Sequence, residues 1–285
     1  MPNLRDIRRR IRSVRNTQQV TRAMKIVAAA RLRRAQERIL ATRPYAIQMN
    51  EVLSSLASRA NPESHPLLAD RGEERVELIV VTADKGFCGG FNTNIIKRAQ
   101  QFLRENGDRV KSLHLVGKKG ADHFGKLGYE ISGRHIDVFR KVEYSHAARI
   151  AGHVIERFLG GSLDAVHVVY NQFKSVIQQQ VVVERLLPIE RLESKEPPQD
   201  YIYEPGPLEL FDRLLPRHVE YKVLRALLES AAAEFAARMS AMDTATRNAG
   251  DLIQELTLNM NRVRQASITS EIIEVVSGAQ AQTAI

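Results

Sequence analysis

The chain has 285 residues, 44% of them apolar, which is enough to bury a sizeable core in one or two domains. No apolar run approaches the ~18 residues that a membrane-spanning helix needs, and the start, MPNLRDIRRRIRSV, lacks the apolar core of a secretory signal. The single cysteine, Cys88, excludes an internal disulfide and a cysteine-based zinc site, so the composition predicts a cytoplasmic protein.

The positive charge of the chain is local. The formal net charge is +9, yet residues 1–60 hold 14 Lys and Arg against three acidic residues, so the remaining residues are slightly acidic. Aromatic side chains that stack on bases are absent before Tyr45, which disfavours nucleic acid, and the apolar stripe is too narrow for a membrane surface. An acidic protein surface is the partner that this charge favours.

Residues 1–60 are predicted to form one coiled-coil helix. There is no glycine, and the only proline after Pro2 is Pro44, which is expected to bend the helix without ending it. Two columns with a seven-residue period form a seam that is interrupted at Gln18 and Lys25. Such a helix would be a rod of ~80 Å. The columns are Ile7, Val14, Thr21, Ala28, Ala35, Thr42, Met49 and Leu56, and Leu4, Ile11, Gln18, Lys25, Leu32, Ile39, Ala46 and Leu53.

Residues 75–190 are predicted to form a Rossmann-like α/β domain with a mostly parallel sheet, because strand and helix patterns alternate. The last two strands are joined by only a few residues, which predicts a hairpin at one edge of the sheet. Residues 191–211, with several prolines, are predicted to be a connecting loop. The expected strands are 76–82, 110–117, 164–173 and 176–188, and the expected helices are 92–105, 118–127 and 145–159.

Residues 212–285 are predicted to form a second coiled-coil helix, weakened only by Gly250 between Pro216 and Gly278. Two long seams at opposite ends of one chain predict an antiparallel pair, although a helix-bundle core is the alternative. The fold class is therefore an α/β domain plus a long antiparallel coiled coil. The columns are Leu224, Ala231, Arg238, Ala245, Leu252, Asn259, Ala266 and Ile273, and Leu228, Phe235, Met242, Ala249, Leu256, Val263 and Ser270.

The segment TADKGFCGGFNTN, residues 82–94, follows the first strand and has two interpretations. Glycines, Lys85 and a helix start would suit a phosphate, but the spacing is not GxGxxG and no Lys-Ser/Thr pair opens the helix. In the structural interpretation the glycines allow tight turns and Asn92 or Thr93 caps the helix. Cys88 is interpreted as a packing residue rather than a nucleophile.

No catalytic, cofactor or metal site is expected from the sequence. His146 and His153 could share a helix face, but there is no HExxH motif and no His/carboxylate cluster along the chain, and the carboxylates have no acid/base spacing. Near the C-terminus, Ile268, Ile272 and Val276, with Ile273 and Val275, surround nearly the whole helix. A helix end that is apolar all round is expected to insert into another protein.

Three segments resemble the signature segments of the gamma subunit of F-type ATP synthases: IRSVRNTQQVTRAMKIVAAARLRRAQ (11–36), TADKGFCGGFNTN (82–94) and RQASITSEIIEVVSGAQA (264–281). The resemblance runs from end to end and implies a non-catalytic rotary shaft. This shaft would transmit torque between a proton-driven ring of c subunits and a hexamer of alpha and beta subunits. It further implies an epsilon partner, no bound nucleotide or cofactor, and a peripheral position at the cytoplasmic face of a bacterial inner membrane, reached through the complex.

The resemblance also implies which residues meet each partner. The hexamer contacts would be Met24, Lys25, Arg31, Arg33, Arg34, Arg264, Gln265, Ile268, Ile272 and Val276, and the ring and epsilon contacts would be Tyr201, Tyr203 and Glu204. Two alternatives stay open on the residues alone. One is a coiled-coil adaptor with a degenerate nucleotide-type domain, and the other is a nucleotide-dependent enzyme that uses the 82–94 loop.

Overall fold

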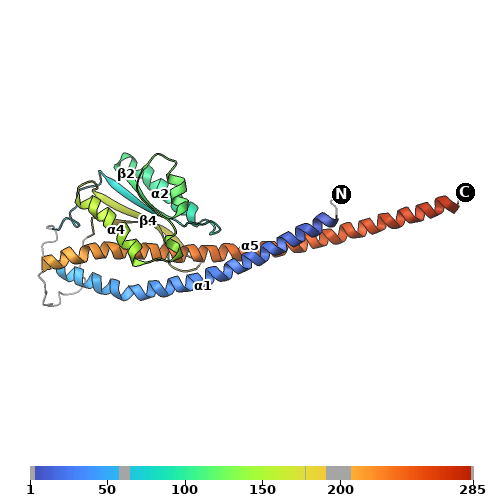
Figure 1. Cartoon of the computed structure of the whole chain (residues 1–285), viewed down its shortest axis with the longest axis horizontal. Coiled ribbons are helices and arrows are strands. Elements are labelled where there is room, and N and C mark those ends of the chain that lie inside the picture. The colour runs from blue at the N-terminus through green and yellow to red at the C-terminus, as the bar shows by residue number, and fades with distance from the viewer. Residues whose placement is uncertain (1–3, 58–64, 177, 191–206, 284–285) are drawn as a thin grey trace. The chain divides into compact units, whose positions relative to one another are not determined.

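The computed structural model describes residues 4–57, 65–176, 178–190 and 207–283 of the chain (Figure 1). It divides into two compact units. The first contains Met1–Val27 and Met239–Ile285, and the second is Ala28–Arg238. Among the described residues, no helix is long and apolar enough to cross a membrane.

Two helices much longer than the rest contribute to both units. Helix α1 runs over Leu4–Ala57 and α5 over Pro207–Thr283. Pro44 lies inside α1, which confirms that this proline does not end the helix. Helix α5 begins earlier than the expected boundary at 212, with proline as its first residue, where the missing N–H costs nothing.

The second unit contains a five-stranded sheet in the order β3-β2-β1-β4-β5. Strands β1, β2, β3 and β4 pair in parallel, and β5 is antiparallel to β4 at the edge. This confirms the mostly parallel sheet and the terminal hairpin. The elements are β1 (Val76–Val81), α2 (Phe91–Asn106), η2 (Gly107–Arg109), β2 (Val110–Val116), α3 (Lys118–Phe124), β3 (Glu130–His135), η3 (Val138–Arg140), α4 (Tyr144–Leu159), β4 (Ala165–Phe173) and β5 (Gln179–Leu187).

Strand β3 is absent from the sequence prediction. Its sequence, EISGRH, has one large apolar residue and an internal glycine, and none of its residues is fully buried. An edge strand of this kind lacks both the apolar run of a buried strand and a regular alternation, so it gives little local signal.

Helices α2 and α4 lie on opposite faces of the sheet. Phe102 of α2 lies against His167 of β4, with ring centroids 5.1 Å apart. Arg157 of α4 instead reaches Glu77 of β1, which is in register with Val166, the neighbour of His167. Since successive side chains on a strand point to opposite faces, the two contacts lie on opposite faces.

Helix α5 covers the same face as α4. Glu184 of β5 is in register with Val168 and therefore faces the same way as Glu77. It accepts a hydrogen bond from Arg225 of α5 at 2.6 Å and another from Tyr170 at 3.0 Å. Residues 230–236 of α5 are all buried, because the sheet side and α1 enclose this stretch of helix.

The predicted seam of α1 is confirmed. Every described position of its two columns with an assigned burial is buried or half-buried, including Ile7, Ala28, Leu32 and Leu53. On α5 one column is wrong beyond Ala245, since Leu252, Asn259, Ala266 and Ile273 are exposed, and the other column is wrong at Ser270, which is also exposed. The residues that follow Leu252, Asn259 and Ala266 are half-buried. The buried stripe of α5 advances because a helix with 3.6 residues per turn drifts from a strict seven-residue repeat.

Gly117, at the end of β2, is held in a conformation that only glycine adopts readily. Its φ is +89°, and a Cβ there would lie 2.0 Å from the Thr82 carbonyl oxygen.

We expect Gly117→Ala to lower the free energy of unfolding by ~3 kcal/mol or more, through backbone strain and a clash. The control is Gly128→Ala, with φ +77° and no atom within 4 Å of the added Cβ. It should cost only ~1–2 kcal/mol in urea unfolding. Equal losses in the two variants would contradict the packing argument.

His218 of α5 makes the stability of the chain depend on pH. It is 4% exposed, and burial, helped by Lys222 and Arg225, lowers its pKa from 6.5 to about 4. As pH falls, the unfolded chain therefore takes up this proton first. The contribution of neutral His218 to the free energy of unfolding is intact above pH 6.5. It is lost as the pH falls from 6.5 to about 4, and the total loss is at most ~3 kcal/mol.

Replacing His218 by glutamine should therefore flatten the fall in unfolding free energy between pH 7 and pH 4.5 relative to the wild type. The measurement is urea unfolding at the two pH values. A variant whose stability falls as steeply as that of the wild type would show that His218 is not the group responsible.

Candidate functional site

Three polar side chains of α1 reach across to α5 inside the first unit. Lys25 Nζ lies 2.6 Å from the Asp243 carboxylate, and the hydroxyls of Thr21 and Thr246 are 2.8 Å apart. The Gln18 amide donates to the Thr246 carbonyl at 3.3 Å. Because residue numbers rise on α1 as they fall on α5, these contacts confirm the antiparallel pair.

These contacts explain the polar interruptions in the α1 seam. Gln18 and Lys25 occupy core-facing positions but satisfy their polar groups on the partner helix, which fixes the register of the pair. The hydrogen bond from Lys25 is the main cause that lowers the pKa of Asp243. Gly250 gives Gln18 its room, since a Cβ there would lie 3.1 Å from the amide nitrogen.

The hexamer contacts that the resemblance implies on α1 fall in both units. Met24 and Lys25, in the first, are half-buried, and Lys25 is paired. Arg31, Arg33 and Arg34, in the second, are exposed. The Arg31 guanidinium lies 5.9 Å from the Phe235 ring, and Arg33 pairs with Glu37 on its own helix at 3.2 Å.

Arg31 and Arg34 line a cleft of the second unit, which we call the basic cleft. It has a volume of about 420 Å³, and its lining includes the apolar rings of Phe139 and Phe235. Arg38, which also lines the cleft, donates to the Val142 carbonyl at 3.3 Å. The lining residues are Arg31, Arg34, Ala35, Arg38, Phe139, Arg140, Lys141, Val142, Leu228, Ala231 and Phe235. A lining of several arginines and apolar side chains suits an acidic segment that also carries an apolar side chain.

The apolar end of α5 is exposed. Ile272 is 58% and Val275 71% exposed, and the neighbouring predicted residues Ile268 and Val276 are also exposed. Arg264 and Gln265, just before them, are exposed as well. The register of the pair places the start of α1 opposite the region of Arg264, so the rest of the described helix extends past its partner. The predicted contacts Tyr201, Tyr203 and Glu204 lie outside the described residues.

The 82–94 loop is held together by its own side chains. Asn92 accepts a hydrogen bond from the Ala83 N–H at 2.9 Å and donates to the Lys85 carbonyl at 3.3 Å. Asp84 accepts from the N–H groups of Lys118 and Asp137, at 3.0 and 2.9 Å, which ties the loop to the following turns. These contacts are those of a packing element and support the structural interpretation.

The predicted cap of the following helix is wrong. Helix α2 begins at Phe91 with Gly90 as its N-cap residue and no side-chain cap, so Asn92 is already inside the helix and points back into the loop. Cys88 is 1% exposed, and burial, followed by the charge of Glu234, raises the pKa of its thiol. A buried thiol with a raised pKa is a poor nucleophile, in keeping with the packing interpretation.

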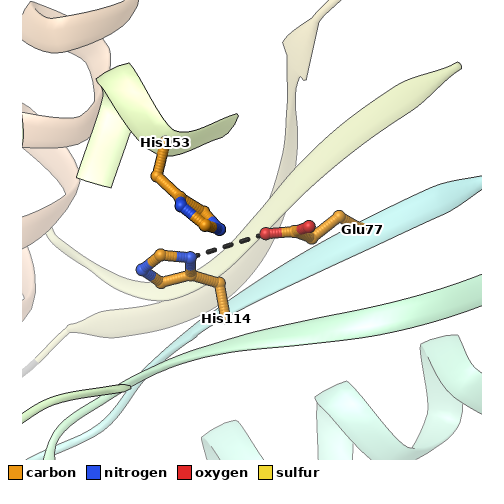
Figure 2. Close-up of side chains that lie close together, drawn as sticks. All are labelled: Glu77, His114 and His153. Atoms are coloured by element: carbon orange, nitrogen blue, oxygen red, sulfur yellow. Dashed lines mark ion pairs between the residues drawn. The ribbon is translucent and has the colours of Figure 1, made fainter. Parts of the chain in front are cut away.

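Sequence reasoning missed a buried group of one carboxylate and two imidazoles. Glu77 of β1, His114 of β2 and His153 of α4 point toward one another, and their nearest ligand-type atoms all lie within 4.8 Å (Figure 2). Burial raises the pKa of Glu77, but its contacts with His114, Ser132 and Arg157 outweigh burial, so the pKa falls below its usual value. The three residues are far apart along the chain, and only the parallel register of β1 with β2 hints at their proximity.

Comparison with known proteins identifies the class. The family model described as ATP synthase matches residues 3–282. The chain therefore belongs to the ATP synthase family.

Its relatives within that family are gamma chains. It is 53% identical to the ATP synthase gamma chain of Solibacter usitatus and 50% identical to that of Anaeromyxobacter sp. strain K, each over 99% of both chains. Among solved structures it is similar to the central stalk/c-ring of the Tetrahymena thermophila mitochondrial ATP synthase. That match has 26% identity and a TM-score of 0.62, and it covers 79% of this chain and 99% of the other. A chain of the Euglena gracilis mitochondrial enzyme shares the fold, with 20% identity, a TM-score of 0.69 and coverage of 99% and 95%.

The contact between Thr21 and Thr246 allows a direct test of the helix register. In a Cys88→Ser background, Thr21→Cys with Thr246→Cys should form an intramolecular disulfide on mild oxidation, because the native hydroxyl oxygens are 2.8 Å apart. The control pair is Thr21→Cys with Arg247→Cys, since Arg247 is exposed and bonds Asp243 of its own helix. Non-reducing electrophoresis measures both pairs, and equal cross-linking would contradict the register.

Proposed function

We propose that this chain is the gamma subunit of a bacterial F-type ATP synthase and works as its central rotary shaft. The observation that carries the proposal is the antiparallel pair of α1 and α5, from which the exposed apolar end of α5 extends. A pair whose register is fixed by polar contacts across its seam resists sliding. Exposed isoleucine and valine on all sides of a helix end require a surrounding protein.

The exposed residues suggest how each partner is met. The basic cleft, with Arg31 and Arg34, and the adjacent Arg33 would meet acidic segments of the beta subunits, together with Met24 and Lys25 of the other unit. Arg264 and Gln265 would bind polar loops of the hexamer, and Ile268, Ile272 and Val276 would turn inside an apolar sleeve. Apolar contacts are non-directional, which suits a bearing. Tyr201, Tyr203 and Glu204 are proposed to meet the c ring and epsilon.

We further propose that the chain performs no bond chemistry itself. The interpretation of the 82–94 loop as a packing element supports this, because its polar side chains Asn92 and Asp84 are used in hydrogen bonds to the protein backbone. In the proposed division, residues 1–60 and 212–285 carry torque. The domain at 75–190, with the connection at 191–211, would couple them to the ring. The two similar gamma chains are from bacteria, so the expected place is the cytoplasmic face of the inner membrane, held there by the partner subunits.

Reversing the charge of Arg33 and Arg34 together should reduce proton-driven ATP synthesis at least several-fold without unfolding the pair. Both side chains are exposed, and repulsion of an acidic partner replaces attraction. The measurement is ATP synthesis by the assembled complex in energised membrane vesicles, with subunit content checked on the same preparation. The matched control reverses Lys97 and Arg104, two exposed basic residues of α2, and should keep activity. Normal synthesis by the folded Arg33/Arg34 variant would refute the proposed contact.

Co-purification separates the shaft from a free-standing adaptor. A tagged chain expressed in its own cells should bring down the alpha, beta and epsilon subunits in fixed proportion, identified by mass spectrometry. Recovery of the chain alone, or with proteins unrelated to the synthase, would contradict the proposed function.

A further inference from the structure

The group formed by Glu77, His114 and His153 lies inside the α/β domain of the second unit. Glu77 is 0% and His114 1% exposed, and His153 of α4 is half-buried at the outer side of the group. Figure 2 shows the carboxylate and both rings converging from β1, β2 and α4. Three potential metal ligands from three elements therefore face one small volume.

Two imidazole nitrogens of this group are buried without a partner among the described residues: the Nε2 atoms of His114 and His153. Nδ1 of His114 makes no standard hydrogen bond and has only the ion-pair contact with Glu77 at 3.5 Å. Leaving buried polar atoms unpaired is costly, and native proteins rarely do so. Each neutral imidazole has one nitrogen with a free lone pair, so the two rings can offer two lone pairs to a metal ion beside the Glu77 carboxylate.

The local backbone makes room for the His114 ring. A Cβ at Gly133 of β3 would lie 2.4 Å from Cε1 of that ring, so any other residue would displace it. The His114 ring is also stacked on His135, with centroids 5.0 Å apart and an interplanar angle of 11°. The ring is thus held in one orientation, with Nδ1 toward Glu77.

The spacing of the atoms fits a tetrahedral ion. Nδ1 of His114 is 3.5 Å from Oε1 of Glu77. Two ligands bound to zinc at ~2.0–2.2 Å in tetrahedral geometry lie ~3.4 Å apart. The widest separation in the group, no more than 4.8 Å, would close by a small rotation of His153, the most exposed of the three.

The carboxylate is already oriented in the way that metal-binding carboxylates are. Ser132 donates to Oε1 at 2.8 Å, and Ser112 donates to Oε2 at 2.9 Å. Arg157 also bonds Oε2, which leaves a lone pair of Oε1 facing His114. Hydrogen bonds of this kind fix a ligand in place. One carboxylate and two imidazoles suit a zinc-class transition metal rather than magnesium or calcium, which prefer oxygen ligands.

We propose that Glu77, His114 and His153 form a binding site for a zinc-class divalent transition metal ion, with water as a fourth ligand on the side of His153. The ion would join α4 to β1 and β2 and act as a structural clamp of the domain. This site is independent of the proposed shaft function, because it involves neither the helix seam nor the exposed end of α5.

The test uses the purified full chain, stripped of metal with a chelator and titrated with Zn²⁺ by calorimetry. Cobalt absorption serves as the geometric probe. We expect one ion per chain, tetrahedral cobalt bands and a higher melting temperature with zinc. His153→Gln should weaken binding at least ~10-fold, since even the loss of an outer contact to a metal ligand costs 10–100-fold. It should also abolish the shift in melting temperature.

Two controls make the result specific. His123→Gln removes a half-buried histidine of α3 that contacts Gln100, and it should keep the wild-type affinity. Cys88→Ser should do the same, which excludes the thiol as the ligand. His153→Gln decides the outcome even where His114→Gln fails to fold, because His153 is only half-buried. Absence of saturable binding, or equal affinity in the His153 and His123 variants, would overturn the proposal.

Discussion

The burial of one narrow seam on α1 is the constraint on which the rest of the structure depends. A helix of 54 residues with small and apolar side chains on one stripe is unstable in water unless that stripe is covered. In each unit a stretch of α5 covers it, through Thr246 and Asp243 in the first and Phe235 in the second. The two ends of the chain must therefore meet, and the α/β domain is folded from the residues between them.

Polar residues on that seam give the pair its register. An entirely apolar seam could slide by a turn at little cost, but Gln18, Thr21 and Lys25 each have one partner position on α5. A shift would bury Gln18 without its carbonyl acceptor. The same residues break the apolar pattern in the sequence, so features that weaken the periodicity are those that specify the pairing.

The sequence predicted best those elements whose hydrophobic pattern extends over many residues. The α1 seam, the parallel sheet and the edge hairpin are confirmed, because their patterns extend over many residues or lie in clear apolar runs. Strand β3 was missed because pairing with β2, rather than local composition, makes it a strand. Asn92 or Thr93 was assigned to the helix cap by residue type, yet both lie inside α2, and the Asn92 side chain binds the loop that precedes the helix.

The buried Glu77 group could not be predicted from sequence. Glu77 sits in an apolar run where a charge is unexpected, and this was its only local signal. Its partners Ser112, His114, Ser132 and Arg157 come from three other elements, so the group exists only once the sheet has formed. The candidate partner contacts differ in this respect. Arg33 and Arg34 are marked by the resemblance of their segment to a family signature, and the apolar residues of α5 are recognisable in the sequence because they surround nearly the whole helix.

The enclosure of α5 between residues 230 and 236 has a mechanical consequence. Residues on every side of this stretch of helix are buried, including the small Ala231 and Ala236, so neighbouring residues of the unit pack tightly all around it. Rotation of α5 about its own axis would force the buried side chains of Glu234 and Phe235 into densely packed neighbours. A torque applied to the domain is therefore transmitted to α5 without rotation of the helix relative to the residues around it.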